Sequence, residues 1–437
     1  MSAVKDIEFT QIAADWNAIT LGEENPQALL AIRNGLTTKQ DQGSGDYKIS
    51  RIETIGDGWI DETRVRFASD LKEKDVEKYR IQRGDILFSH INSDPHLGKT
   101  GFAERDYEDL LHGMNLLLIR ANPAVFDAEF LNRVFQYYRD IGVFVSICSR
   151  SVNQSSINQA RLKAVEVPLP PLPEQKKIAH ILSTVQRAIE VQERIIQTTT
   201  ELKKALMHKL FTEGIRNEPQ KQTEIGPVPE SWEVVELGEF FQIKHGYAFD
   251  GKFFEQSGEF ILMTPGHFHE EGGFRDQGEK TKYFTGEIPQ DYVLAKDDLV
   301  VAMTEQKSGL LGSSAFVPED SRYLHNQRLG LIVDLDTKRL SKNFLFNVFN
   351  LPPLRVEVAK TSTGSKVKHT SPTKLRAVKI GIPPTLEEQE EIATAVATTE
   401  QKIGLATNKK TQLQDLFRTL LHELMIAKTR AHQIEHI

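Results

Sequence analysis

The feature that most constrains this fold is an internal duplication, because a repeated sequence predicts a repeated structure. Across 437 residues, a set of landmarks recurs in the same order at an offset of about 213 residues. These landmarks are a Trp followed by Leu-Gly-Glu, and a Pro-Pro pair followed by Glu-Gln and Ile-Ala. They lie at Trp16, 21–23, 170–171, 174–175 and 178–179, and again at Trp232, 237–239, 383–384, 388–389 and 392–393. Their conserved order predicts two tandem copies of one folding unit.

The first part of each copy mixes the patterns of helix and strand. Short apolar runs such as 85–89 and 116–119 lie between Gly, Asn and Asp turns and predict buried strands. Residues 130–138 instead show the apolar spacing of a helix. We therefore expect the α+β class, with two α/β globules in tandem.

A long helix is predicted after each globule. Residues 174–211 contain no Gly or Pro, and their apolar residues recur in steps of three and four, which is typical of a coiled-coil seam. A stripe this narrow suits another helix better than a flat sheet, although packing of each helix on its own globule stays open. The residues expected to pair the two helices are Ile178, Leu182, Val185, Ile189, Leu202, Leu206, Leu210, Ile392, Val396, Ile403, Leu416, Leu420 and Leu424.

Proline, glycine and polar residues mark the boundaries between these parts. We expect a first globule at 1–173, its helix at 174–213, a linker at 214–230, a second globule at 231–386, its helix at 387–428 and a frayed tail at 429–437. The two helices are expected to pair as an antiparallel coiled coil, with pseudo-two-fold symmetry between the copies.

Composition excludes several classes of protein. No apolar run approaches the ~18 residues that span a bilayer, so we expect no membrane contact. The only cysteine, Cys148, excludes an internal disulfide and fits a reducing cytoplasm. The net charge is −7, yet residues 358–386 hold six basic and no acidic side chains, and 141–165 are also free of acids. Such segregation predicts local basic surface that can face phosphates.

No pattern in the chain predicts catalysis convincingly. Asp298, Glu305 and Lys307 imitate the spacing of metal-dependent nucleases, in which carboxylates hold Mg²⁺ and a lysine steadies the phosphate. A Mg-dependent nuclease that uses these three residues is one alternative function for the chain, and a coiled-coil tether without DNA binding is another. We expect instead a non-catalytic chain with no cofactor and no metal site.

The best candidates for DNA contact are loops without acids and with many hydrogen-bond donors, because Lys and Arg bind phosphates while Arg, Lys, Asn and Gln read base edges. The leading stretch is 361–369, and its equivalent in the first copy is 150–156. The predicted contacts are Thr363, Ser365, Lys366, Lys368, His369, Arg150, Asn153 and Gln154, followed by Lys39, Gln40, Asn92, Lys99, Thr100, Gln306, Lys307, Gln327 and Arg328.

The motifs resemble those of the specificity subunits of type I restriction-modification systems. The resemblance rests on the twin repeats, on Pro-Pro-Leu-Pro-Glu-Gln-Lys-Lys-Ile-Ala at 170–179 and on Pro-Glu-Ser-Trp-Glu-Val at 229–234, and it covers essentially the whole chain. It implies that each globule is a target-recognition domain for half of a bipartite site in double-stranded DNA, with the helices setting the spacing. It also implies two methyltransferase subunits as partners for DNA methylation, and restriction subunits in the full assembly. The second copy departs slightly from this motif, because residues 383–389 hold one extra residue between the Pro-Pro pair and the Glu-Gln pair.

Overall fold

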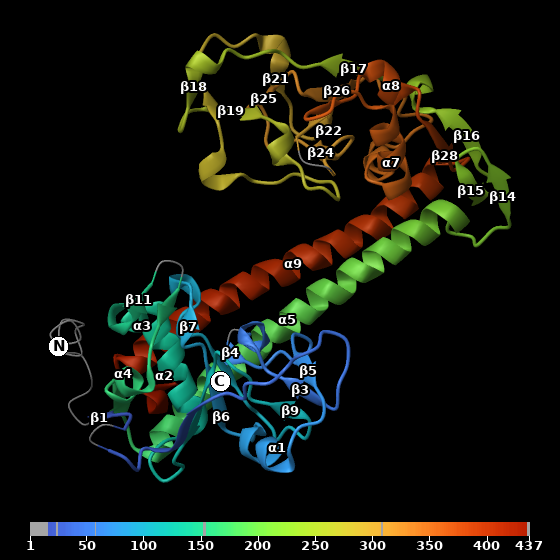
Figure 1. Ribbon diagram of the computed structural model, residues 1–437. Coiled ribbons are helices and arrows are strands. Elements are labelled where there is room, and N and C mark those ends of the chain that lie inside the picture. Colours follow the sequence, from blue (N-terminus) through green and yellow to red (C-terminus); the bar gives the residue numbers. More distant parts are fainter. Residues whose placement is uncertain (1–15, 23–24, 57, 152–153, 307–308, 435–437) are drawn as a thin grey trace. The chain divides into compact units, whose positions relative to one another are not determined.

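A computed structural model describes residues 16–22, 25–56, 58–151, 154–306 and 309–434 (Figure 1). The chain divides into two compact units. Unit 1 comprises the described residues up to Glu193 together with those from Thr407 onward, and unit 2 comprises Arg194–Ala406. Each unit contains one globule and part of both long helices. The predicted fold class, two tandem mixed globules each followed by a long helix, is confirmed.

The main sheet of unit 1 has five strands in the order β2-β10-β6-β8-β4. They are β2 (Leu29–Asn34), β10 (Leu117–Ala121), β6 (Asp85–Phe88), β8 (Thr100–Phe102) and β4 (Gly58–Trp59). Successive side chains of a strand point to opposite faces. Ile86 and Phe88 therefore pack into the cluster that contains the helix residue Phe130, whereas Leu87 and Leu118 pack into a second cluster with Ile81.

Shorter elements complete unit 1. Its helices are α1 (Glu73–Tyr79), α2 (Ala128–Asp140), α3 (Val143–Ile147) and α4 (Gln159–Lys163). Its remaining strands are β1 (Asn17–Thr20) with β13 (Glu166–Leu169), β3 (Tyr47–Ile49) with β5 (Arg66–Ala68) and β9 (Leu110–Leu111), and β7 (Ile91–Asn92) with β12 (Ser155–Ser156) and β11 (Ser149–Arg150).

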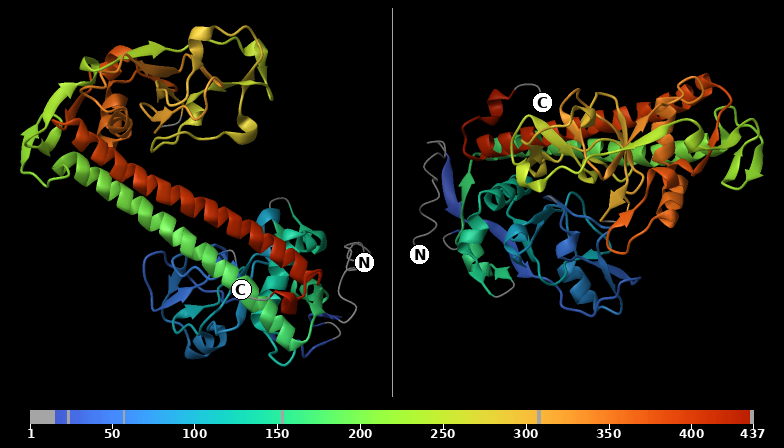
Figure 2. Two further views of the ribbon diagram at one scale, coloured as in Figure 1. Left: turned by 180° about the vertical axis from the view of Figure 1, so that it is seen from behind. Right: turned by 90° about the horizontal axis from the view of Figure 1, so that it is seen from above.

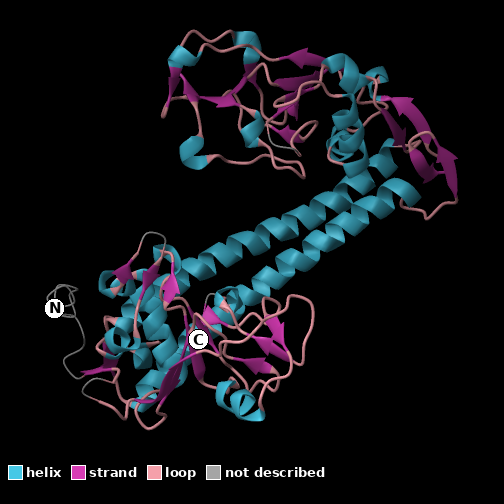
Figure 3. Ribbon diagram, in the orientation of Figure 1, coloured by secondary structure: helices cyan, strands magenta, loops and turns pink. Residues whose placement is uncertain are grey.

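Unit 2 repeats this plan with short strands joined by long loops (Figure 3). Its main sheet is β17 (Gln242–His245), β26 (Leu329–Val333), β22 (Leu299–Ala302) and β24 (Ser314–Phe316), in that order. A second sheet has the order β18 (Phe254–Glu255), β20 (Tyr283–Phe284), β19 (Phe260–Met263), β25 (Tyr323–His325) and β21 (Val293–Leu294). The other elements are β16 (Glu233–Glu236) with β28 (Lys379–Ile382), β23 (Thr304–Glu305) with β27 (Lys368–His369), and helices α6 (Lys342–Phe349), α7 (Pro352–Thr361) and α8 (Pro372–Arg376). Within the expected linker, β14 (Gln220–Thr223) and β15 (Gly226–Pro229) form a hairpin.

The repeated Glu-Gln pair fixes each long helix to its own globule. In unit 1 the indole N–H of Trp16 donates to Glu174 at 3.2 Å, and in unit 2 that of Trp232 donates to Glu388 at 3.2 Å. These bonds tie the tryptophan, the first landmark shared by the two copies, to the first turn of the helix that follows each globule. The motif that opens the helix is therefore a joint between helix and globule.

The glutamine beside each of these glutamates makes a second tie. The side-chain carbonyl of Gln175 accepts from the Asp127 amide at 2.8 Å, and that of Gln389 accepts from the Ser341 amide at 2.8 Å. Asp127 and Ser341 are the N-cap residues of α2 and α6, so the amide side chain satisfies a backbone donor at a buried helix end.

The long helices are α5 (Leu172–Glu213) and α9 (Leu386–Met425). In unit 1 the beginning of α5 shares one buried cluster with the end of α9 and with the globule, as Ile178, Leu420 and Phe130 show. In unit 2 the end of α5 packs with the beginning of α9 through Leu210 and Ile392 (Figures 1 and 2). The start of each helix meets the end of the other, so the helices are antiparallel. They pack both on each other and on the globules.

Two residues expected to pair the helices do not do so. Leu202 is 56% exposed and Leu416 is 43% exposed. Lys203, next to Leu202, instead reaches Glu400 of α9 at 2.5 Å, and Phe417, next to Leu416, packs against the core of unit 1. At both positions the next residue along the helix makes the contact, so the packed face is turned by one residue from the predicted seam. Of the other expected residues, Leu206 and Ile403 are half-buried and the rest are buried: Ile178, Leu182, Val185, Ile189, Leu210, Ile392, Val396, Leu420 and Leu424.

The expectation of a frayed tail is wrong for the described residues up to Ile434. The Arg430 guanidinium makes two hydrogen bonds of 2.7 Å to the two carboxylate oxygens of Glu174, and it lies over the Trp16 ring. Ala431 is buried. The tail thus closes over the joint between helix and globule in unit 1. No helix among the described residues is long and apolar enough to cross a membrane.

We predict that Gln389→Met destabilises the protein by about 1–3 kcal/mol, because the apolar side chain leaves the buried Ser341 amide without an acceptor. The measurement is the free energy of unfolding in urea. The matched control is Gln401→Met on the exposed face of the same helix, which should stay within about 0.5 kcal/mol of the parent. Equal effects of the two substitutions would contradict the role of the joint.

Candidate nucleic-acid interface

In unit 1 the two loops expected to contact DNA are joined into one small sheet. β7 pairs with β12, which pairs with β11, and Asn92 stands opposite Ser155. The carboxylate of Asp94 accepts hydrogen bonds from the Ser155 hydroxyl and, at 3.4 Å, from the Arg150 guanidinium. The structure therefore brings Asn92 and Arg150, which are distant in sequence, onto one ribbon. We call β7, β12 and β11 the ribbon of unit 1.

Unit 2 carries the equivalent ribbon, formed by β23 and β27. Thr304 stands opposite His369 and Glu305 opposite Lys368. The ammonium of Lys368 lies 3.9 Å from the Glu305 carboxylate, and its side chain is 42% exposed. Each unit thus sets one acid beside one base of its ribbon, although Asp94 itself lies just after β7. The shared arrangement indicates that both copies build their candidate interface in the same way.

The basic loop of unit 2 is a hairpin rather than an open loop. Thr363 and His369 exchange two backbone hydrogen bonds of 2.9 and 2.8 Å. Gly364 has a φ of 103°, and a Cβ on it would lie 2.0 Å from the Val367 carbonyl oxygen, so only glycine fits this position. Lys366 lies exposed within the hairpin. Backbone geometry therefore presents this lysine to solvent.

The nuclease interpretation of Asp298 and Glu305 is wrong. One carboxylate oxygen of Glu305, a residue that is 5% exposed, accepts the amides of Gly309, Leu310 and Leu311, each at 2.9 Å. Asp298 lies at the opposite end of β22 and accepts from the Ala295 amide at 2.9 Å. The two carboxylates do not converge, and Lys307 lies outside the described residues. Nowhere in the described chain do three or more His, Cys, Asp or Glu side chains gather to hold a metal.

Arg355 holds the same loop from its other side. Its guanidinium donates to the carbonyls of Leu311 at 2.6 Å and Glu270 at 3.2 Å, and also to that of Gly309. Burial lowers the pKa of Arg355 to about 10. The loop after β23 is thus fixed by a carboxylate on its amides and a guanidinium on its carbonyls. Sequence analysis missed Arg355, because no local pattern links it to a loop 44 residues away.

Several predicted DNA contacts lie outside the ribbons. Thr100 is fully buried in β8, so its assignment as a DNA contact is wrong. Gln40 accepts from the Arg51 guanidinium at 2.7 Å, and Asp41 in the same loop pairs with Phe67 of β5, while the neighbouring Lys39 is exposed. Asn153 is outside the described residues. Other predicted contacts are exposed or half-buried: Lys99, Gln154, Gln306, Ser365, Gln327 and Arg328.

A turn precedes β10 in unit 1 and β26 in unit 2, and a buried histidine closes each one. The Nε2 of His112 lies 3.0 Å from the Leu116 carbonyl oxygen, and that of His325 lies 3.0 Å from the Leu329 carbonyl oxygen. A carbonyl can only accept, so Nε2 carries the hydrogen in both rings. Both rings are fully buried, and burial lowers the pKa to about 3 for His112 and about 4 for His325.

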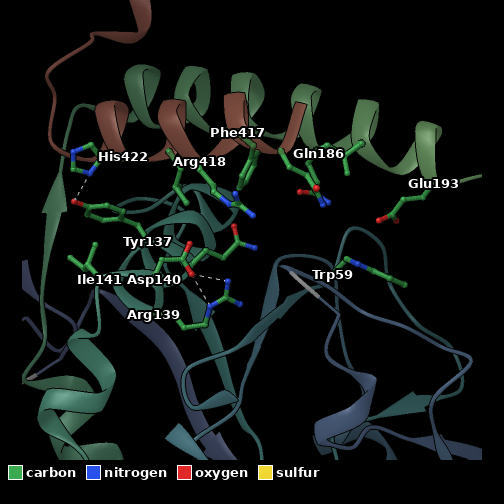
Figure 4. A pocket seen from close by; sticks show the side chains of 14 residues that line it. Trp59, Tyr137, Arg139, Asp140, Ile141, Gln186, Glu193, Phe417, Arg418 and His422 are labelled. Atoms are coloured by element: carbon green, nitrogen blue, oxygen red, sulfur yellow. Dashed lines mark hydrogen bonds and ion pairs between the residues drawn. The ribbon is translucent and has the colours of Figure 1, made fainter. Parts of the chain in front are cut away.

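A separate pocket of about 620 Å³ lies in unit 1 between α2 and the two long helices (Figure 4). The Tyr137 hydroxyl lies 3.2 Å from Nδ1 of His422, and Arg139 donates to Asp140 at 2.8 Å. The exposed ring of Trp59 forms part of its wall. Among the predicted DNA contacts that the structure describes, none lines this pocket. It is distinct from the ribbon.

Comparisons with known proteins find the same duplication. The profile of the type I restriction modification DNA specificity domain matches residues 15–201 and again residues 229–415. A putative type I restriction enzyme MjaX specificity subunit of Methanocaldococcus jannaschii is 34% identical over 98% of this chain and 96% of the relative. The MjaVIII specificity subunit of that organism is 29% identical over 62% of this chain and 63% of the relative. The crystal structure of a type I restriction-modification S subunit from M. genitalium shares the fold, with a TM-score of 0.61, 15% identity and coverage of 93% of this chain and 95% of that one.

We predict that acid weakens the fold through the two turn histidines. Their pKa values are lower in the folded state than the ordinary 6.5, so the unfolded chain binds more protons below that pH. Each histidine should therefore cost about 1.4 kcal/mol of stability per pH unit as the pH falls from 6.5 toward 4. Urea unfolding across this range measures the loss. His325→Gln should make the slope shallower, and an unchanged slope would contradict the assignment.

Proposed function

This chain belongs to the family of type I restriction-modification DNA specificity subunits, and we propose that each of its two units reads one half of a bipartite site in double-stranded DNA. A specificity subunit recognises the DNA sequence, while catalysis lies in its partner subunits. The observation that carries the division into half-sites is the duplicated ribbon, which both units form at the same strand of the main sheet. A tether without DNA binding has no support from this family.

We propose that the ribbons supply the first contacts with DNA. The support is their chemistry, since exposed Lys, Arg, Ser and Thr side chains suit phosphate oxygens. In unit 2 these are Lys366 and Lys368, and in unit 1 the equivalent cation is Arg150, whose side chain is 67% exposed. Asp94 and Glu305 keep the loops in shape, so the cations need not be ordered anew when DNA arrives.

The proposed partners are two methyltransferase subunits and, in the full assembly, restriction subunits. Each unit joins its helix to its globule in the same way, and this repeated construction supports the proposal that two copies of one partner bind two equivalent surfaces. We propose recognition domains at 1–173 and 231–386, joined by spacer helices at 174–213 and 387–428. A cytoplasmic location accords with the free thiol of Cys148.

We predict that the double replacement Lys366→Ala and Lys368→Ala weakens binding to specific and random DNA alike. Each lost phosphate contact should lower the slope of log affinity against log salt by about 0.9. The measurement is a fluorescence anisotropy titration of the full chain with labelled random-sequence duplex at several salt concentrations.

The matched control is Lys252→Ala in the same unit, where the lysine lies on no ribbon and pairs with Asp250 at 3.0 Å. This control should leave both affinity and slope close to those of the parent. If the double variant keeps the parental salt slope, the two lysines do not contact phosphates and the ribbon of unit 2 is not the interface.

A further inference from the structure

The turn closed by the histidine is held from a second side in both units. A Cβ on Gly35 would lie 1.8 Å from the carbonyl oxygen of Gly113, and one on Gly246 would lie 2.0 Å from that of Asn326. No side chain fits between these backbones, so the chain that follows β2 or β17 lies directly against the turn. The histidine and the glycine together form a frame that both copies share.

The tips of the two turns differ, although their frames agree. In unit 1 the tip holds Asn115, which is exposed and has a φ of 68°. In unit 2 the equivalent residue is Arg328, which is also exposed and whose amide is fixed by the Asn326 side chain at 3.0 Å. A shared frame that carries different donor side chains is the arrangement that two readers of different half-sites require.

Backbone hydrogen bonds place each tip next to the ribbon. In unit 2 the Met303 amide donates to the Arg328 carbonyl at 2.9 Å, and the Thr370 amide donates to the Met303 carbonyl at 2.9 Å. Arg328 is therefore two strand spacings, roughly 10 Å, from the residue that follows β27. A major groove is about 12 Å wide, so one groove can receive both the ribbon and the tip.

The first unit has the same geometry. Leu117 stands opposite Phe88, so continuing this antiparallel register sets Asn115 opposite His90. The carbonyl of His90 accepts from the Ile157 amide at 2.8 Å, directly after β12. The tip and the ribbon thus lie at the same end of the main sheet in both units.

We infer that Asn115 and Arg328 are equivalent base-reading residues, one for each half-site, and that His112 and His325 are the positioning residues that hold them. Arg pairs in bidentate fashion with guanine, and Asn pairs in the same fashion with adenine. Unit 2 then reads a guanine at this position, and unit 1 reads an adenine. This inference rests on the proposed function, because it needs the two units to face two half-sites.

The test is selection of bound DNA from a randomised duplex library by the full chain, alone and in complex with methyltransferase subunits, followed by sequencing. Arg328→Ala should lose a guanine preference of about 10- to 100-fold at one base pair of one half-site. Asn115→Ala should lose an adenine preference at one base pair of the other half-site. Arg322→Ala, an exposed arginine of unit 2 paired with Glu319 at 2.7 Å, is the matched control and should select the parental site.

The positioning role is tested in the same library. His325→Leu should lose the same guanine preference as Arg328→Ala, whereas His325→Gln, whose amide can still donate to the Leu329 carbonyl, should keep most of it. Thermal unfolding of each variant shows that it is folded at the selection temperature, and a His325→Leu chain that is folded yet keeps the preference overturns the positioning role.

Three results separate this inference from the proposed function. Unchanged base preferences in folded Arg328→Ala and Asn115→Ala overturn the inference and leave the two-reader function intact. Loss at the same half-site in both variants overturns the assignment of one tip to each half-site. A parental chain that selects no sequence, alone or in complex, overturns the proposed function and the inference with it.

Discussion

The hydrogen bonds of the repeated Glu-Gln pair are the constraint on which the rest of each unit depends. They join the first turn of a long helix to the indole at the start of the globule and to the cap of the globule's central helix. Most of these groups are buried and the others, Glu174 and Asp127, are half-buried, so breaking the joint would leave polar atoms without partners at a cost of about 1–3 kcal/mol for each buried one. Within a unit, the helix and the sheet that carries the ribbon therefore behave as one body. In unit 1 the tie between Arg430 and Glu174 adds the end of the chain to that body.

Much of this architecture could be predicted from the sequence, and the part that could not has a common cause. The duplication and the two long helices follow from local patterns, namely landmarks at a fixed offset and a long stretch without Gly or Pro. The ribbons follow from no local pattern, because two-residue strands such as β7 and β12 pair across some sixty positions of the chain. Leu202 and Leu416 failed for a related reason: a seam counted on one helix does not show which of two neighbouring residues faces the packed side, and here Lys203 and Phe417 make the contacts. Thr100 failed because it lies in β8, an inner strand of the five-stranded sheet that is covered although it follows a polar loop.

Glu305 shows how a spacing of acids and a lysine can mislead. Its carboxylate accepts three consecutive backbone amides, which is a structural task that suits an acid in a basic loop. Arg355 completes the task by donating to the Gly309 and Leu311 carbonyls of the same loop. The two charges are thus used to shape backbone. Lys368 and Arg150, by contrast, keep side chains that are 42% and 67% exposed and can reach a ligand.

The ribbons and turns are held together mainly by main-chain hydrogen bonds and by a few buried side chains. Gly364 and Asn115 are restricted by their positive φ, but the other exposed side chains on them contribute little to folding, so exchanging one of these for another costs the fold little. A lineage can alter such residues one at a time, and can do so in one half of the duplication while the other half stays unchanged. The recognised sequence becomes a trait that varies by single substitutions, and the number of possible targets is the product of what the two halves can each specify.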